Sequence, residues 1–120
     1  MTDLELLARA DAVAGRAYAP YSGFHVGCAV LTHDGVVIEG VNVENGSYPL
    51  GVCAERAAFS RAVAEGRRPG DFAVAAITAS PCGGCRQWLA EMKVERVVFR
   101  NGGRVVTMSV DELLPEQFEL

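Results

Sequence analysis

Residues 72–85 read Phe-Ala-Val-Ala-Ala-Ile-Thr-Ala-Ser-Pro-Cys-Gly-Gly-Cys. The run from Phe72 to Thr78 is apolar and has the length of a strand, which is typical of a central strand buried on both faces. The dipeptide Ser80-Pro81 breaks this run and predicts the start of a helix. A buried strand that leads directly into a helix predicts a sheet covered by helices.

The other segments show the periodicities of helices and strands, separated by Gly, Pro, Asn and Asp. Thr2 and Glu5 have the spacing of a capping box at the start of a helix. Asp34-Gly35 lies between two runs of β-branched and aromatic residues, which is a strong signal for a hairpin. In chain order we expect a helix up to Pro20, strands over residues 24–31 and 36–43, a loop over 42–51, a helix over 53–65, a second helix from Ser80, strands over 94–99 and 105–109, and a short helix over 111–114.

This order of elements predicts the fold class. Strands are followed by strand-helix units, and crossover helices have to cover a sheet whose central strands are apolar throughout. We therefore expect an α/β protein, a three-layer α/β/α sandwich with a mixed central sheet of about five strands. The chain has 120 residues, half of them hydrophobic, which is enough for one core, so we expect a single domain over residues 1–120.

Charge and hydropathy limit the partners of the chain. The net charge is −4, and the basic residues are scattered apart from Arg67 and Arg68, so no basic stripe is available for a phosphate backbone. No stretch approaches the roughly 20 apolar residues of a membrane span, and the N-terminus lacks a targeting pattern. We expect a cytoplasmic protein that binds a small neutral ligand, with neither nucleic acid nor membrane as a partner.

Three of the four cysteines lie in a pattern that predicts a metal site. Cys53 lies at the predicted start of one helix, and Cys82 and Cys85 lie at the start of the next. A helix start offers unpaired N–H groups and the positive end of the helix dipole, which favour a thiolate. Three protein ligands and one water are the pattern of catalytic zinc, so we expect one Zn2+ with an open fourth position. Glu55 is then the candidate acid and base.

A Cys-x-x-Cys pair on its own would also fit a redox pair or half of a structural zinc site. In a purely structural site Cys28 or a histidine would complete the coordination, and the protein would only bind partners. We expect instead that Cys28 is buried in its strand, because a free cysteine behaves as a small hydrophobe. Cys-Ala-Glu at 53–55 together with Pro-Cys-Gly-Gly-Cys at 81–85 matches the zinc-deaminase signature, with Cys in place of the usual His.

Five stretches resemble the small homotetrameric cytidine deaminases, and together they extend over nearly the whole chain. They are Tyr18-Ala-Pro-Tyr-Ser22, Val41-Asn-Val-Glu-Asn45, Tyr48-Pro-Leu-Gly-Val-Cys-Ala-Glu-Arg56, Ser80-Pro-Cys-Gly-Gly-Cys-Arg-Gln87 and Leu113-Leu-Pro-Glu-Gln-Phe118. Cys-Ala-Glu is the form of the motif in enzymes of free nucleosides, whereas relatives that edit polynucleotides carry His-x-Glu. The resemblance implies hydrolytic deamination of cytidine and 2′-deoxycytidine to uridine and deoxyuridine plus ammonia, in pyrimidine salvage.

The resemblance also implies a mechanism. Zinc acidifies a bound water, Glu55 takes its proton, and hydroxide attacks C4 of the cytosine ring. The same carboxyl group then protonates N3 and the departing amine. Three thiolates make the zinc centre formally negative, and Arg56, one helical turn after Cys53, is expected to withdraw charge from the sulfur atoms, as in tetrameric relatives. The sequence does not fix the direction of Arg86, and we assign it no role.

The substrate-binding residues implied by the resemblance come from separate segments. Asn42 and Glu44 match the pair that holds the ribose hydroxyls, and an analogue without a hydroxyl would leave them unpaired. Phe24 matches the aromatic residue that packs on the pyrimidine. The expected set is Phe24, Asn42, Glu44, Gly46, Tyr48 and Phe118.

Two members of this set imply an oligomer. Tyr48 matches a tyrosine that lines the sugar pocket from a neighbouring chain, and Phe118 matches a C-terminal phenylalanine that reaches into the next subunit's site. The resemblance thus implies a homotetramer whose sites are completed by neighbouring chains.

Two other activities share the motif. A deaminase of an aminonucleoside antibiotic such as blasticidin has the same fold and zinc motif, but the Asn42-x-Glu44-Asn45 loop favours cytidine. A polynucleotide editor would need a basic surface, and the acidic balance of the chain argues against it.

Overall fold

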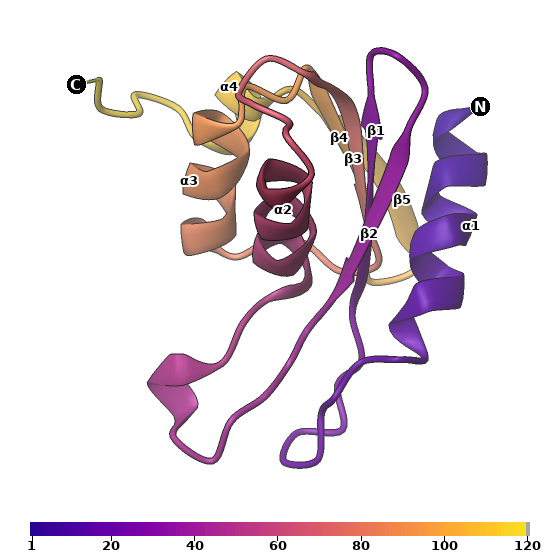
Figure 1. Cartoon of the computed structure of the whole chain (residues 1–120), viewed down its shortest axis with the longest axis vertical. Helices are drawn as coiled ribbons and strands as arrows, with labels where there is room; N and C mark the ends of the chain where they lie inside the picture. The colour runs from indigo at the N-terminus through magenta and orange to yellow at the C-terminus, as the bar shows by residue number, and fades with distance from the viewer. Residues whose placement is uncertain (120) are drawn as a thin grey trace.

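The computed structural model describes residues 1–119, which form one five-stranded sheet with helices on both faces (Figure 1). In chain order the elements are α1 (Asp3–Ala14), β1 (Gly27–Thr32), β2 (Val37–Val41), a 3₁₀ helix (Tyr48–Leu50), α2 (Ala54–Ala64), β3 (Phe72–Ile77), α3 (Gly83–Glu91), β4 (Arg96–Asn101), β5 (Arg104–Met108) and α4 (Val110–Leu113). The predicted α/β/α sandwich with a mixed sheet is confirmed. None of the helices in this part of the chain has both the length and the apolar character needed to cross a bilayer.

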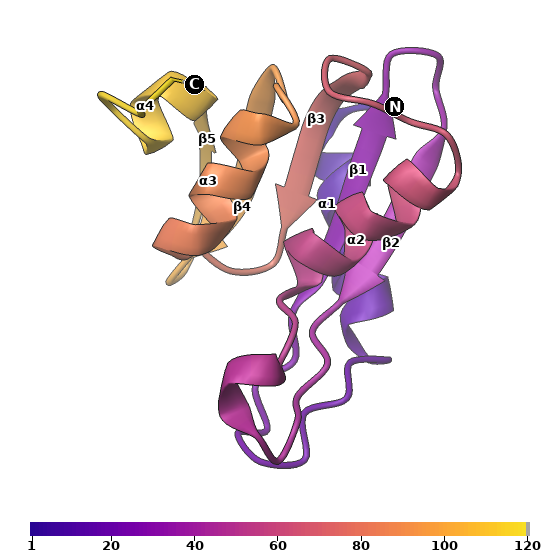
Figure 2. The ribbon, with the colours of Figure 1, turned by 60° about the vertical axis from the view of Figure 1, so that its left-hand side comes forward.

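The strands lie in the order β2-β1-β3-β4-β5. Only β3 and β4 are parallel, and α3 is the crossover that joins them, whereas the other neighbouring strands are antiparallel. α1 covers one face, and α2 and α3 lie side by side on the other (Figure 2). The end of β3 therefore leads directly to the start of α3, on the same face as α2.

The N-terminal helix begins at the predicted capping box. The Thr2 hydroxyl accepts the N–H of Glu5, and the Glu5 carboxylate accepts the N–H of Thr2. The helix ends at Ala14, well before Pro20, because the chain turns there and the N–H of Tyr18 pairs with the carbonyl of Asn42 at 3.0 Å. Tertiary pairing thus ends the helix earlier than the apolar spacing predicted.

Two glycines let the helices approach the sheet closely. A Cβ added to Gly27 would lie 2.0 Å from the carbonyl oxygen of Ala10 in α1. A Cβ added to Gly40 would lie 2.4 Å from the amide nitrogen of Ala58 in α2. On the α2 face the core is built around Phe59 and Phe72, whose rings meet edge to face at 5.2 Å. The position of α2, which carries half of the candidate site, is therefore set by contact with β2.

Two segments, residues 15–26 and 42–53, leave the same end of the sheet and together form an arm (Figure 1). Single bridges join Tyr18 to Val43 and Val43 to Val52. The strand predicted from residue 24 begins only at Gly27, because the N–H of Val26 pairs with the Asn42 side chain at 2.8 Å. The 3₁₀ helix lies within the stretch that the sequence predicted as plain loop.

Candidate metal centre and adjoining cavity

The three predicted sulfur ligands lie together at the starts of α2 and α3. Cys53 is the N-cap residue of α2 and Cys82 is that of α3, both with extended backbone, and neither side chain is used in a capping hydrogen bond. The second helix thus begins at Gly83 and not at Ser80, with Pro81 just before the cap. The Sγ atoms of Cys53, Cys82 and Cys85 all lie within 4.8 Å of one another. Within residues 1–119, no His, Cys, Asp or Glu joins this group as a fourth member.

The electrostatics of the cluster favour a bound cation. The backbone N–H of Cys85 lowers the pKa of the Cys82 thiol. Burial raises the pKa of Cys53, and burial together with the carboxylate of Glu55 raises the pKa of Cys85. Three thiolates so close together need positive charge beside them, and zinc prefers thiolate ligands. The donor set therefore fits one Zn2+.

Glu55 lies in the first turn of α2, and only 4% of its surface is exposed. Carboxylates are rarely buried to this extent unless they are paired or functional. Burial raises the pKa of Glu55, which favours a carboxyl group that can hold a proton. Glu55 is thus a buried carboxyl group with a raised pKa, and it lies beside the sulfur cluster.

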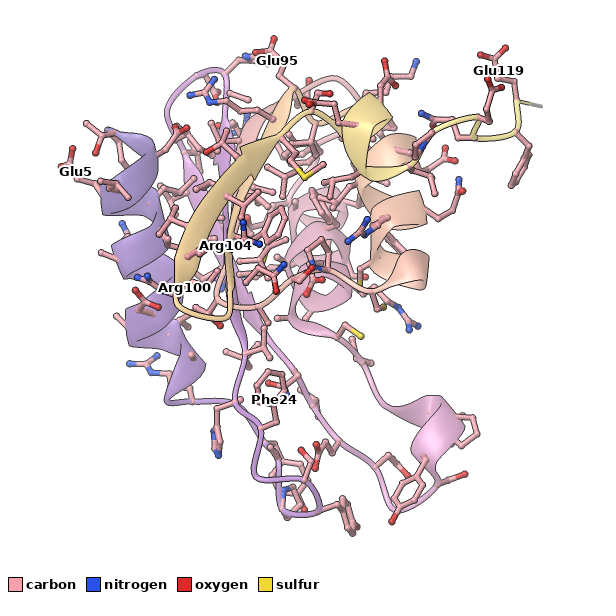
Figure 3. All side chains as sticks on the ribbon, turned by 180° about the vertical axis from the view of Figure 1, so that it is seen from behind. Glu5, Phe24, Glu95, Arg100, Arg104 and Glu119 are labelled. Atoms are coloured by element: carbon pink, nitrogen blue, oxygen red, sulfur yellow. The ribbon has the colours of Figure 1, made fainter. Side chains whose placement is uncertain are left out.

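A cavity of about 200 Å³ opens onto this cluster. It is lined by Phe24, Val26, Asn42, Cys53, Ala54, Glu55, Ile77, Ala79, Ser80 and Cys82. The cavity thus brings two of the predicted substrate-binding residues, Phe24 and Asn42, to the same space as Glu55. Phe24 lies where the arm leaves the body of the protein (Figure 3).

The other predicted substrate-binding residues lie elsewhere on the chain. Glu44 and Tyr48 line a separate cavity of about 350 Å³ in the arm, and a Cβ on Gly46 would lie 3.0 Å from the hydroxyl of Tyr21 nearby. Phe118 is 68% exposed and lines a third hollow beside α3 and α4. A single chain therefore does not bring Tyr48 or Phe118 to the cavity that holds Glu55.

The two arginines next to the motifs differ in their contacts. The Nε atom of Arg56 is buried and has no hydrogen-bond partner among the described residues. Arg86, for which the sequence predicted no role, donates from Nε to the carbonyl of Pro81 at 2.9 Å and from Nη1 to the carbonyl of Leu113 at 3.0 Å. No sequence signal predicts the Leu113 contact, because the two residues are brought together by the packing of α4 on α3.

Cys28 lies outside the sulfur cluster. Its side chain is completely buried in β1, and burial raises its pKa well above the ordinary value. The predicted burial of this residue is confirmed, and it packs in the core on the α2 face of the sheet. The fourth ligand required by a purely structural zinc site is therefore not supplied by Cys28.

Three sulfur ligands beside a buried carboxylate, at the wall of a small cavity, define the class of mononuclear zinc hydrolases. A sequence model of the family described as the cytidine and deoxycytidylate deaminase zinc-binding region matches residues 1–101. The chain belongs to this family, and it is a zinc-dependent deaminase.

Individual relatives agree with this family. The chain is 45% identical over 111 residues to a cytidine deaminase of Halalkalibacterium halodurans, which covers 85% of this chain and 83% of that protein. The crystal structure of a cytidine deaminase from Burkholderia pseudomallei has a TM-score of 0.92 and 45% identity, with coverage of 98% and 100%. That of the Mycobacterium tuberculosis cytidine deaminase has a TM-score of 0.86 and 35% identity, with coverage of 100% and 99%.

Proposed function

We propose that the chain converts free cytidine to uridine and ammonia, with Glu55 as the group that moves the protons. The observation that carries the proposal is the burial of Glu55 in the wall of the cavity that Cys53 and Cys82 also line. When bound, zinc supplies the Lewis acidity that lowers the pKa of a water molecule to about 7. Cys53, Cys82 and Cys85 would hold that ion.

The reaction requires two proton transfers at neighbouring atoms of the base. The oxygen of water forms a bond to C4, the bond from C4 to the exocyclic amine breaks, and the amine leaves as ammonia. The Glu55 carboxylate accepts the proton of the attacking water and delivers it to N3. It then takes the remaining hydroxyl proton and passes it to the leaving amine. A single carboxyl group can do both because Glu55 is buried in the wall of this cavity, where burial raises its pKa and lets it hold a proton between the two transfers.

We propose that Phe24 and Asn42, which both line this cavity, hold the nucleoside. The Asn42 amide accepts the N–H of Val26 and donates to the carbonyl of Phe24, both at 2.8 Å. Each end of the amide keeps one further hydrogen-bonding position, which a ribose hydroxyl can use. The two existing bonds fix the amide and the backbone of Phe24 together, so the groups proposed for the sugar and the base are oriented as a unit.

Glu44 is already held inside the arm. Its carboxylate accepts the N–H groups of Tyr21 and Ser22, at 3.0 and 3.1 Å, and the hydroxyl of Ser22. The hydrogen bond from the Ser22 side chain lowers the pKa of Glu44 most, and the two backbone N–H groups lower it further. The carboxylate therefore stays ionised. We propose that this fixed carboxylate accepts a hydrogen bond from a sugar hydroxyl, as the family resemblance implies, and that Gly46 keeps the adjoining turn narrow.

We also propose that neighbouring chains complete each site in a homotetramer. Tyr48 is 76% exposed and lies far out on the arm, where its ring meets that of the exposed Tyr21, and Leu50 of the same 3₁₀ helix is exposed too. Large apolar side chains clustered on one surface mark contact sites between proteins. A second copy packed on the arm would cover these residues and bring Tyr48 and Phe118 to a partner's cavity.

Arg56 fits a role in balancing the charge of the thiolates. Its buried Nε–H has no acceptor within residues 1–119, and Arg56 lies one helical turn after Cys53. A buried donor without a partner is costly, and a thiolate sulfur is a suitable acceptor. We expect Arg56→Ala to weaken zinc retention or turnover by roughly tenfold.

The proposal extends to 2′-deoxycytidine as a second substrate and to a cytoplasmic reaction in pyrimidine salvage. A compartment that keeps thiols reduced supports a three-cysteine metal site, since oxidation of Cys82 and Cys85 to a disulfide would destroy it. Ammonia release from both nucleosides, measured in parallel with release from a cytosine-containing oligonucleotide, tests this range. Faster reaction of the oligonucleotide would favour a polynucleotide editor instead.

The decisive variant is Glu55→Gln, which keeps the size of the side chain and removes its ability to accept a proton. We expect full zinc content and a loss of at least about a thousandfold in turnover of cytidine, followed by the ultraviolet change on conversion to uridine. Glu91→Gln, an exposed residue of α3, is the matched control and should retain full turnover. Near-normal turnover of Glu55→Gln would refute the proposed role.

A further inference from the structure

The start of α3, which carries two of the three sulfur ligands, has little local support. Gly83 and Gly84 occupy the first turn of this helix. Glycine favours a helix much less than alanine does, because it loses more backbone freedom on folding. Neither glycine is required by packing, because a Cβ added to either would meet no atom of the described residues within 4 Å. Cys82 is exposed, so burial does not fix it either.

The side chain of Arg86 supplies the missing support. Its Nε–H donates to the carbonyl of Pro81, the residue directly before Cys82, at 2.9 Å. Its Nη1 donates to the carbonyl of Leu113 at 3.0 Å, and Nη2 lies 3.5 Å from the hydroxyl of Ser80. A guanidinium is a planar, rigid fork, so these bonds fix the loop before Cys82 relative to Leu113.

The partner at the other end of this contact is the C-terminal helix. Leu113 is the last residue of α4, and the final carbonyls of a helix lack partners within the helix and attract positive charge. α4 has only four residues, which is too short to be stable without tertiary contacts. The segment that leads to Phe118 begins directly after it, so the position of this segment also depends on Arg86.

We propose that Arg86 is a positioning residue that ties the Cys82 loop of the zinc site to α4. The inference rests on the proposed zinc-dependent function. Arg86 neither binds the metal nor touches the reacting atoms. It holds Cys82 in the geometry that closes the three-sulfur site, and it sets the direction in which the C-terminal segment leaves the body.

The rate of zinc release to excess 4-(2-pyridylazo)resorcinol, a coloured chelator, tests this proposal on the purified zinc-loaded protein without substrate. We expect Arg86→Ala to release zinc roughly tenfold faster or more, the size typical of losing a group that orients a ligand. Arg86→Lys, which has a charge but no fork, should fall between Arg86→Ala and the unsubstituted protein. Arg96→Ala is the matched control, because Arg96 makes two similar bonds to Asp3, at 2.9 and 2.8 Å, on the α1 face.

The outcomes separate this proposal from the proposed function. If the unsubstituted protein holds zinc and Arg86→Ala releases zinc at the same rate, only the role of Arg86 is overturned. Equal acceleration by Arg96→Ala would overturn it too, since the effect would then be general destabilisation. Should Arg86→Ala not fold, Arg86→Lys decides, and release at the unsubstituted rate counts against the proposal. Unsubstituted protein without zinc would overturn both proposals at once.

Discussion

Gly40 is the residue of β2 that lies against α2. We expect Gly40→Ala to displace α2 and, with it, residues of the candidate site. The added Cβ would lie 2.4 Å from the amide nitrogen of Ala58 and 2.6 Å from the carbonyl oxygen of Ala54, both backbone atoms. Ordinary contact begins at 3.4 Å, so α2 has to move by about 1 Å. Such overpacking costs roughly 1–3 kcal/mol of the free energy of unfolding.

The same displacement reaches the chemistry, because Cys53 and Glu55 lie at the start of α2. A misplacement of about 1 Å can lower turnover roughly a hundredfold. We therefore expect Gly40→Ala to lower Tm by about 4–12 °C and kcat for cytidine by about a hundredfold. Differential scanning fluorimetry and the ultraviolet assay measure the two effects.

Gly103→Ala is the control for this substitution, because a Cβ at Gly103 meets no atom within 4 Å in the part of the chain that the structure describes, and the φ of Gly103 is not positive. It should leave Tm and kcat unchanged. The reasoning is refuted if Gly40→Ala matches the unsubstituted protein in both measurements, since α2 would then not be held by this contact.

Three further predictions concern the neighbouring subunit, the core and the surface charges. When Glu55→Gln and Phe118→Ala chains are mixed and reassembled, activity should rise above that of either variant alone. In a mixed oligomer, some sites combine an intact Glu55 from one chain with an intact Phe118 from its neighbour. Activity that never exceeds the average of the two variants would contradict shared sites. Metal analysis of Cys28→Ala should find one zinc per chain, and the variant should lose about 1 kcal/mol of the free energy of unfolding. Loss of the metal would instead indicate a structural zinc site that includes Cys28. The bond to Arg96 lowers the pKa of Asp3 in the folded state. The stabilisation that this bond gives the folded protein is therefore full above the ordinary pKa of 3.8 and is lost as the pH falls through the lowered value. The Tm difference between Arg96→Ala and the unsubstituted protein should then vanish in acid. The pair is partly exposed, so this difference should be below about 1 kcal/mol, and a gap that persists unchanged at low pH would count against the assignment.

Local chemistry explains why much of the fold could be predicted from the sequence. The capping box of Thr2 and Glu5, the glycine turn after Asp34 and the apolar run from Phe72 each depend on residues a few positions apart. Cys53 and Cys82 were also predicted near helix starts, although the second helix begins at Gly83 and not at Ser80.

Features that depend on distant contacts could not be predicted. α1 stops at Ala14 because Tyr18 pairs with Asn42, and the apolar spacing of α1 contains no information about that partner. The bonds of the Glu44 carboxylate to Tyr21 and Ser22 likewise join segments far apart in the sequence. The contact of Arg86 with the end of α4 is of the same kind.

The residues expected to serve a neighbouring subunit form a third group. Tyr48 and Phe118 were assigned by resemblance. Both are exposed in the single chain, as expected of residues that a partner subunit covers. Their position relative to Glu55 depends on how two copies pack, which is a property of the assembly and not of the local sequence. The subunit-mixing experiment addresses that assembly directly.

X-ray absorption at the zinc edge of the purified protein most directly tests the claim that three cysteines hold one catalytic zinc ion. The account predicts three sulfur atoms at about 2.3 Å and one lighter oxygen at about 2.0 Å, the pattern of a site with an exchangeable water. Substitution of Cys82 by serine should reduce the number of sulfur atoms by one. Four sulfur atoms around the metal would contradict the account, because no position would remain for the attacking water.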